Sequence, residues 1–470
     1  MAEVTINNLG RIEGASVKEI SIGGKTLKSL QTIPKFQIKS DIDLFLDNIK
    51  NLPEFGGVAF DLWSIPSIYQ SITLSEGQRN LDNLAKAITP AKKMIDKRIC
   101  IIDPNTEWYR YKYITEIEKK KDGTIIHTKQ TDIFNQRGFP KSIKEIFLKK
   151  GTEGHNIAWK EIEKENLLLS FVLWHIEQNL KYNSNLIIPP APLVDGTNQN
   201  MLTIVEKINK IAKELTFEDT DVFGSFYLPI HPDVFVEDDR CTRVLQTIKN
   251  NLMVNTILVL KFFRVKNAII DPSSRARLSR FLSTLDNLKQ SYLDNIAIIA
   301  LDTSEEGMAL MSNGIDIACD PLGGVKDKVP FRKSKKDSKK DSSDGHEEQI
   351  EINPFKSYGK YVHPETREYT KITDLMNMLD GKGNLPHDCY ACKQLHGRLI
   401  NKKDKKFPNF NEWNLHRRLH NFTFRREEDL WLSNAVIDNN IKAPEIYLSK
   451  RTRADKNLVD ILPSSIFELK

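Results

Sequence analysis

The sequence predicts an α/β fold, a (β/α)8 TIM-type barrel with a zinc-binding subdomain near the C-terminus. Short segments that are apolar at nearly every position recur along the chain, and stretches with helical periodicity separate them. Such strands are typical of a parallel sheet that is buried on both faces. Six or seven of these units within about 300 residues favour a barrel over an open doubly wound sheet. No glycine-rich phosphate loop follows a strand, which argues against a dinucleotide-binding fold.

The elements follow one another in a regular order. The chain opens with a β-rich segment, 17–36, in which Gly23-Gly24 indicates a hairpin turn. One long helix is predicted from Trp159 to Leu180. The predicted barrel strands are 57–61, 98–103, 186–189, 222–228, 256–261, 296–301 and 315–320.

Changes in composition divide the chain into four parts. Residues 1–325 contain the β-rich N-terminal segment and most of the barrel. Residues 326–352 are a charged insertion, which we expect to be disordered because it has too few apolar residues to offset its ordering entropy. Residues 353–440 contain the zinc-binding subdomain and complete the barrel, and 441–470 form a basic tail.

The overall composition predicts a cytoplasmic protein that does not enter a membrane. Of its 470 residues, 40% are hydrophobic and 28% are charged, as in ordinary globular proteins. There is no run of about 18 apolar residues, and the N-terminus lacks the layout of a signal peptide. Five scattered cysteines do not suggest a disulfide framework. The net charge of +6 permits a nucleic-acid partner without requiring one.

A metal site is predicted at the segment His387-Asp388-Cys389-Tyr390-Ala391-Cys392. Two cysteines separated by two residues can bind one ion, and His387 supplies a third local ligand. The fourth ligand would be His420 or His416. The alternative is a chance pair of cysteines, which the flanking histidines make the weaker interpretation.

Acidic residues occur where several predicted strands end. Asp61, Asp103 and Asp320 end strands, and Asp195 lies in the loop after another. The carboxyl ends of barrel strands carry catalytic groups. Each aspartate taken alone could instead cap a helix or form a turn.

The helical segment Asn411–Ala435 combines arginines with aromatic residues. Its cations are Arg417, Arg418, Arg425 and Arg426, and the aromatic residues among them are Trp413, Phe422, Phe424 and Trp431. Guanidinium groups beside aromatic rings suit phosphates and unstacked bases. Equally, the helix could pack its aromatic side chains against the barrel and leave its arginines in solvent.

These motifs together resemble the tRNA-guanine transglycosylase family. That family has a C-x-C-x2-C zinc motif completed by a histidine in a His-Asn-x-x-Phe context. Here His387 stands at the first cysteine position, and Leu419–Phe424 fits the histidine context, which favours His420 as fourth ligand. Residues 301–307 and 313–320 are similar to the segment that leads to the family's nucleophile. The resemblance spans roughly residues 20 to 435, and the zinc region is its specific part.

The resemblance implies exchange of a guanine in nucleic acid for a 7-deazaguanine through a covalent aspartyl intermediate. Asp320 would be the nucleophile and Asp103 the acid/base or a purine contact, while zinc would be structural. Asp195, Asp316, Lys261 and Arg264 are the further candidates for substrate binding. The implied partners are DNA or tRNA, the 7-deazaguanine base and, beyond these, a homodimer or partner protein. The DNA-modifying branch of the family is the more similar one.

One departure from the family bears directly on the chemistry. Cys319 stands at the position of the family's nucleophile, and Asp320 comes one residue later. A second interpretation is therefore a catalytically inactive barrel that acts as a nucleic-acid-binding or partner subunit, and a third is a hydrolytic glycosidase. The exchange mechanism requires Asp103 and Asp320 to face one pocket.

Overall fold

The computed structural model describes most of the barrel and part of the C-terminal region. The described residues are 4–12, 14–36, 39–62, 96–106, 118–119, 125–126, 138–150, 154–216, 223–263, 265–303, 307–321, 361–362, 369–370, 387–394 and 410–438. The predicted charged insertion 326–352 and basic tail 441–470 lie outside them, as does Arg264. Within these ranges, no helix has both the length and the apolar character needed to cross a membrane.

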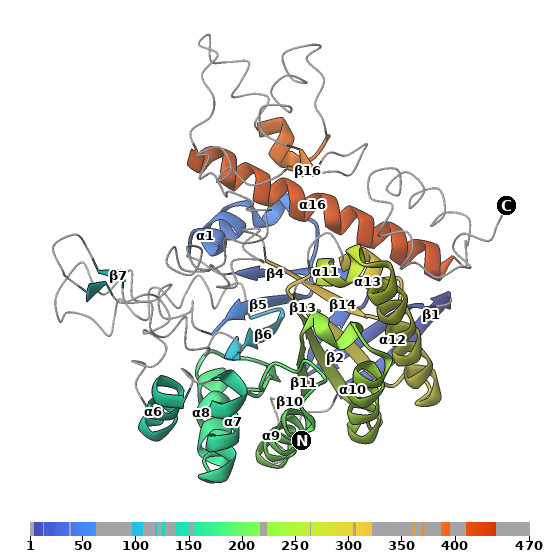
Figure 1. Cartoon of the computed structure of the whole chain (residues 1–470). Helices are drawn as coiled ribbons and strands as arrows, with labels where there is room; N and C mark the ends of the chain where they lie inside the picture. The colour runs from blue at the N-terminus through green and yellow to red at the C-terminus, as the bar shows by residue number, and fades with distance from the viewer. Residues whose placement is uncertain are drawn as a thin grey trace, which may run out of the picture.

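A parallel sheet forms the centre of the molecule (Figure 1). Its order is β10-β9-β6-β5-β4-β14-β13-β12-β11, and every pairing in it is parallel. The strands are β4 (Gln31–Phe36), β5 (Gly57–Asp61), β6 (Ile99–Asp103), β9 (Leu186–Ile187), β10 (Phe223–Gly224), β11 (Phe226–Ile230), β12 (Ile257–Phe262), β13 (Ala297–Leu301) and β14 (Ile317–Pro321). Each predicted barrel strand overlaps one of these.

The sheet curls into a nearly closed barrel. β10 pairs with β9 at one end of the strand order, and β11 pairs with β12 at the other. Only Ser225 separates β10 from β11, and its backbone N–H donates to the carbonyl of Ile187 at 3.0 Å. Val194 forms a further parallel bridge with Ile230. The two ends of the sheet therefore meet along one stretch of chain.

Helices surround the strands in Figure 1. They are α1 (Lys39–Asn48), α6 (Lys141–Lys150), α7 (His155–Lys164), α8 (Leu168–Lys181), α9 (Gln199–Thr216), α10 (Asp238–Asn251), α11 (Val265–Ile270), α12 (Pro272–Ser291) and α13 (Gly307–Met311), with short 3-10 helices η1 (Ile49–Asn51) and η3 (Pro232–Phe235). Local sequence determines where helix α12 begins. At α12, the Asp271 side chain accepts from the Ser274 N–H at 2.7 Å, and Pro272 occupies the first helical position.

The helix predicted from Trp159 to Leu180 is in fact two helices, α7 and α8. Asn166 has a φ of 56°, the left-handed conformation that asparagine tolerates better than most residues. The N–H of Leu167 donates to the Ile162 carbonyl at 2.9 Å, which closes the end of α7 as in a Schellman motif. An apolar pattern that continues across the break hid it from sequence analysis.

Small antiparallel sheets accompany the barrel. β1 (Val4–Ile12), β2 (Ala15–Ile22) and β3 (Lys25–Lys28) form a three-stranded sheet. The predicted hairpin turn is confirmed, since Gly23 and Gly24 both have positive φ between β2 and β3. Two-stranded pairs are formed by β7 (Glu118–Lys119) with β8 (Ile125–Ile126) and by β15 (Tyr361–Val362) with β16 (Tyr369–Thr370).

The long helix α16 (Phe410–Ile437) lies across one side of the barrel and contacts β4, β1 and β2 (Figure 1). Buried Asp429 accepts a short hydrogen bond from the backbone N–H of Thr32 on β4. Arg426 donates to the Glu54 carbonyl at 2.7 Å and to Asp429 at 3.0 Å. Polar contacts thus hold α16 at a defined position on the barrel wall.

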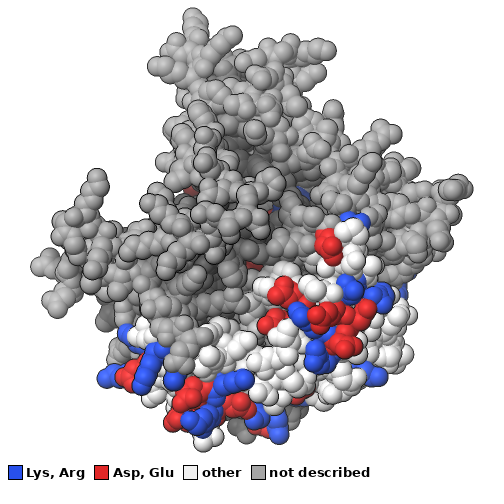
Figure 2. Space-filling view, viewed as in Figure 1, with Lys and Arg blue, Asp and Glu red and all other residues white. Residues whose placement is uncertain are grey.

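The described surface in Figure 2 mixes charges of both signs. Lys and Arg side chains lie beside Asp and Glu side chains over the helices of that face. Exposed pairs such as Lys207–Glu163 at 2.5 Å and Lys210–Glu214 at 3.9 Å are examples of this mixing. Exposed pairs of this kind contribute little to stability because water screens them.

A buried ionic network lies where β14 begins. Asp316, just before β14, accepts from Lys289 Nζ at 2.9 Å and lies 3.6 Å from Lys18 Nζ. Its other oxygen accepts from the Ile298 N–H at 2.7 Å. All three charged side chains are almost fully buried. Although burial opposes it, Lys18 and Lys289 lower the pKa of Asp316, so that it remains ionised.

We predict that Asp316→Asn lowers the free energy of unfolding by about 3 kcal/mol, because it removes the carboxylate that neutralises buried Lys289 and leaves buried Lys18 with Asp294 at 3.8 Å. Urea unfolding at neutral pH would measure the change. Glu214→Gln, which removes the exposed partner of Lys210, should change stability by less than about 0.5 kcal/mol. Similar losses in the two variants would contradict the assignment of Asp316 as a buried anchor.

We also predict a pH dependence from Asp429. Burial raises its pKa to about 6, whereas an unfolded aspartate titrates near about 3.9. The folded state therefore binds more protons in this interval, and the contribution of Asp429 to stability is lost as pH rises from about 4 to about 6. Relative to wild type, Asp429→Asn should become more stable by about 3 kcal/mol across this interval.

Urea unfolding of both proteins at several pH values would check this prediction for Asp429. Asp438→Asn, at the exposed end of α16, is the matched control and should follow the wild-type curve at every pH. A difference between Asp429→Asn and wild type that does not change with pH would show that Asp429 is ionised throughout.

Candidate functional site

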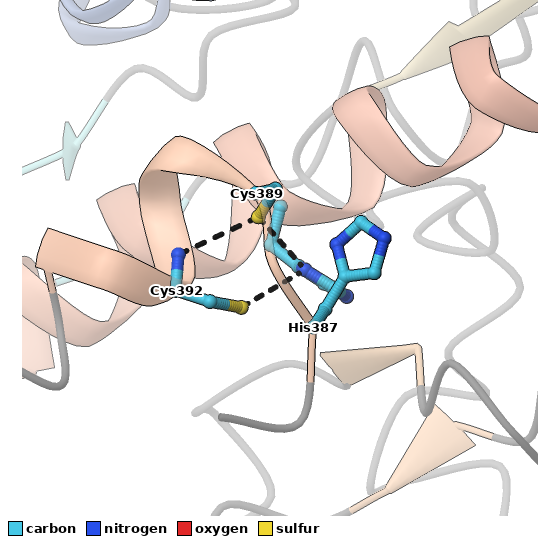
Figure 3. A group of neighbouring side chains, drawn as sticks. His387, Cys389 and Cys392 are labelled. Carbon is cyan, nitrogen blue, oxygen red and sulfur yellow. Dashed lines mark hydrogen bonds between the residues drawn. The ribbon is translucent and has the colours of Figure 1, made fainter. Parts of the chain in front are cut away.

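The four predicted metal ligands form one cluster. The ligand atoms of His387, Cys389, Cys392 and His420 all lie within 4.8 Å of one another. His420 Nδ1 is 3.5 Å from Cys389 Sγ and 3.3 Å from Cys392 Sγ. Figure 3 shows the two sulfurs and the His387 ring bordering the same small space. This cluster of two thiols and two imidazoles could hold a metal ion.

Local structure and packing bring these ligands together. Cys389 directly precedes a helical turn, 390–394, and the Cys392 N–H points back to its sulfur at 3.4 Å. His420 belongs to α16. The alternative fourth ligand, His416, is also on α16, but its side chain lies outside the described part of the structure. His387 Nε2 is 2.9 Å from Glu427 Oε2, so that carboxylate orients the ring and leaves Nδ1 for an ion.

The electrostatics of the cluster favour the charged sulfur that metals require. Hydrogen bonding with Cys392, and then with His387 and His420, lowers the pKa of Cys389 to about 2 although burial opposes it. In contrast, burial raises the pKa of Cys241 to about 11 and that of Cys100 to about 12. Thiolate is the metal-binding form of cysteine. Cys389 is thus chemically distinct from Cys100 and Cys241.

A second group of charged residues lies at the carboxyl ends of the barrel strands, and we call it the mouth cluster. Its members are Lys35, Asp61, Asp103, Asn105, Lys261 and Asp302. They lie at or just beyond the ends of β4, β5, β6, β12 and β13. In TIM-type barrels this is the face that carries catalytic groups.

Two lysines hold the mouth cluster together. Lys35 Nζ lies 2.6 Å from Asp61, 2.5 Å from Asp103 and 2.6 Å from Asp302. Lys261 Nζ lies 2.6 Å from Asp103 and 3.0 Å from Asp302. Both lysine side chains are almost completely buried. The ammonium groups thus bridge carboxylates from separate strands.

Asn105 completes the cluster. Its side-chain nitrogen donates to Asp61 Oδ1 at 2.6 Å, and its side-chain oxygen accepts a short hydrogen bond from Lys261. Its own backbone N–H donates to Asp103 Oδ1 at 3.0 Å, and its φ of 48° lies in the left-handed region. This backbone turn lets one residue contact Asp61, Asp103 and Lys261 together.

The charge states within the mouth cluster differ from one another. Although burial opposes it, Asp103, Asp302 and Asp61 raise the pKa of Lys35, which therefore stays protonated. Burial raises the pKa of Asp61 more than Lys35 lowers it. For Asp302 the balance is reversed, since Lys261 and Lys35 lower its pKa despite burial. Within one cluster, the pKa of Asp61 is thus shifted upward and that of Asp302 downward.

Asp320 is not brought to Asp103. It forms a short ion pair with Arg425 of α16, on the outer side of the barrel wall. Its neighbour Cys319 lies close enough to Lys35, Asp302 and Asp103 for their charges to act on its thiol. Successive side chains of a strand point to opposite faces. Cys319 therefore faces the mouth cluster, and Asp320 faces α16.

The remaining predicted substrate-binding residues are dispersed. Lys261 belongs to the mouth cluster. Asp195 accepts from the Thr197 N–H at 2.9 Å and from its hydroxyl at 2.7 Å, in a turn before α9. Asp316 lies at the amino end of β14, opposite the mouth. Arg264 lies outside the described residues.

Sequence analysis missed Lys35, Asn105 and Asp302. Two signals were present: Lys35 is a charged residue within the otherwise apolar stretch 33–36, and Asp302 directly follows the apolar run 297–301. A charge in either place has to be neutralised if it is buried. The search for acids at strand ends did find Asp61 and Asp103.

The expectation that the arginines of α16 remain in solvent is wrong. Arg417, Arg418, Arg425 and Arg426 are all buried rather than left in solvent. Arg425 pairs with Asp320, and Arg426 contacts Asp429 and the Glu54 carbonyl. The aromatic residue Phe422 packs against Phe45 and Phe55, with ring centroids 5.0 and 5.3 Å apart. Arg425 and Arg426 thus attach α16 to the barrel.

Comparison of the sequence with protein-family models and with curated proteins gives no match in either case. The resemblance to the tRNA-guanine transglycosylase family therefore stays a prediction.

We predict that the purified protein contains a bound metal ion and that Cys389→Ser removes it. Loss of a ligand should lower metal affinity by more than the about 10- to 100-fold that follows loss of an outer hydrogen-bond partner. Elemental analysis by mass spectrometry would measure the metal content. Cys241→Ser, at a buried cysteine of α10, is the matched control and should keep the ion. Equal metal content in the two variants would contradict the site.

Proposed function

We propose that the chain is a zinc-containing (β/α)8 barrel enzyme that exchanges a guanine in nucleic acid for a 7-deazaguanine through a covalent aspartyl intermediate. The observation that carries the proposal is the mouth cluster, which brings Asp61, Asp103 and Asp302 together at the carboxyl ends of parallel strands. Buried groups with perturbed pKa values gather at functional sites more often than elsewhere. A buried ionic group would be a costly way to achieve stability alone.

The strand order supports the eight-unit architecture of this proposal. Only Ser225 separates β10 from β11, so the two can be counted as one barrel strand. This combined strand pairs with β9 through β10 and with β12 through β11. With that reading the sheet has eight parallel strands, and β14 pairs with β4 as the eighth strand of such a barrel pairs with the first. In the described part of the chain, helices follow β4, β6, β9, β11, β12 and β13, as the fold requires.

The ligand set supports zinc as the ion. Two thiolates and two imidazoles are donors that zinc prefers in structural sites, where four protein ligands leave no open position. The cluster is anchored to the barrel, because Cys389 and Cys392 pack in the same apolar core as Phe45 and Phe422. A zinc ion bound there would stabilise the contact between α16 and the barrel without touching the substrate.

The chemistry of base exchange suits the groups at the mouth. A carboxylate can attack the sugar carbon, hold it as an ester and leave again. A second carboxyl group can protonate the departing purine, and the target nucleotide must leave its stack to reach them. Asp103, held by both lysines, is placed to fix the geometry of the cluster or to contact the purine. The ion pair with Arg425 gives no support to Asp320 as the nucleophile.

One observation favours the second function, a catalytically inactive barrel that acts as a nucleic-acid-binding or partner subunit. Cys319 occupies the inward-facing position at the end of β14, where the resemblance implies an aspartate. Burial raises the pKa of its thiol, so that it is not a ready nucleophile. In this function the mouth cluster would be a structural core only.

Base exchange would separate the two functions. We expect the wild-type protein to incorporate isotopically labelled guanine or a labelled 7-deazaguanine into DNA or tRNA, and Asp103→Asn to be slower by about 100-fold or more. Asp233→Asn, at an exposed carboxylate beyond β11, is the matched control and should keep full activity. Binding of nucleic acid without exchange would favour the inactive subunit.

A further inference from the structure

Asp61 and Asp302 share one ammonium group. Asp61 Oδ1 and Asp302 Oδ1 each lie 2.6 Å from Lys35 Nζ, so that the two oxygens are separated by at most twice that distance. Glycosidases that form a covalent sugar–enzyme ester place their two carboxyl groups about 5 to 5.5 Å apart. The upper limit of twice 2.6 Å excludes the wider separation of an inverting pair and is compatible with a double displacement at a sugar carbon. An inverting reaction needs about 6.5 to 9.5 Å, to leave room for water.

The two carboxyl groups differ in access and in charge. The side chain of Asp302 is 23% exposed, whereas that of Asp61 is 2% exposed and that of Asp103 is fully buried. Lys261 and Lys35 hold Asp302 as an anion, while burial favours the protonated form of Asp61. A pair of carboxyl groups whose surroundings separate their pKa values in this way is typical of a nucleophile and an acid.

We infer that Asp302 is the nucleophile and Asp61 the proton donor of the exchange reaction, an inference that rests on the proposed function. Asp302 follows β13, whereas the resemblance places the nucleophile at the end of β14. Cys319 faces the cluster from that strand, where its thiol lies near Lys35, Asp302 and Asp103. The left-handed backbone of Asp302, with a φ of 55°, directs this residue differently from a regular strand continuation.

The reaction balances with these two groups alone. In the first step, an Asp302 oxygen forms a bond to C1′ of the sugar as the C1′–N9 bond breaks. The electron pair of that bond goes to the leaving purine, which takes the proton from Asp61. In the second step, N9 of the incoming base attacks C1′, the ester bond breaks, and its electron pair returns to Asp302. The N9 proton then goes to Asp61, which restores the starting state.

Detection of the ester between the protein and C1′ of the sugar would test whether Asp302 is the nucleophile. We would incubate the protein with guanine-containing DNA and, separately, tRNA, without an incoming base, and isolate the adduct on a denaturing gel. Proteolysis and mass spectrometry would then locate the modified residue. We expect the adduct on Asp302 and its complete loss in Asp302→Asn, in which asparagine tolerates the same backbone conformation. Asp233→Asn is the control that should form the adduct, and thermal unfolding would verify that each variant is folded.

A cationic leaving group tests Asp61. N7-methylguanine departs as a neutral base and needs no proton, unlike guanine. Asp61→Asn should therefore slow release of guanine by about 100- to 10,000-fold and leave release of N7-methylguanine close to that of wild type. Equal slowing of both bases would make Asp61 a structural residue and would overturn its role as acid.

The outcomes distinguish this inference from the function on which it rests. An adduct on Asp103, Asp320 or another residue would overturn Asp302 as nucleophile and leave the exchange reaction standing. Neither adduct nor exchange with either polymer, from folded wild-type protein, would overturn both. Because the adduct is located in the wild-type protein, the result does not depend on whether the Asp302 variant folds.

Discussion

The burial of Lys35 is the constraint on which the mouth of the barrel depends. Its ammonium is removed from water and surrounded by carboxylates that follow β5, β6 and β13. A buried charge costs several kcal/mol unless partners neutralise it. The strand ends that carry Asp61, Asp103 and Asp302 must therefore stay together for the charge of Lys35 to remain buried. The same requirement gathers, in one place, the groups that acid–base and nucleophilic chemistry use.

Helix α16 links this barrel to the candidate metal centre. It carries His420 toward Cys389 and Cys392, and one turn later Arg425 and Arg426 toward the barrel wall. An ion at the cluster would fix the part of α16 next to these contacts. On the same helix, Arg425 neutralises buried Asp320 at the end of β14. The metal would act on the barrel through packing rather than through the substrate.

The pairing of Cys319 and Asp320 shows how much one residue changes at a strand end. The chain sequence brings both residues to the carboxyl end of β14, within one position of the place that the family resemblance implies. Side-chain alternation then assigns opposite faces, so that the thiol meets the mouth cluster and the carboxylate meets α16. A motif comparison that tolerates a shift of one residue cannot detect this reversal.

The sequence by itself determined the barrel strands other than β4, the hairpin at Gly23-Gly24 and the local candidate ligands His387, Cys389 and Cys392, because apolar runs, turn residues and ligand spacing act over short distances along the chain. It also placed Asp61 and Asp103 at strand ends. The burial of the α16 arginines was decided by tertiary contacts. So was the meeting of Lys35 with Asp302, 267 residues away. Such contacts depend on strand order, pleat and the neutralisation of buried charge, which no local pattern in the sequence specifies.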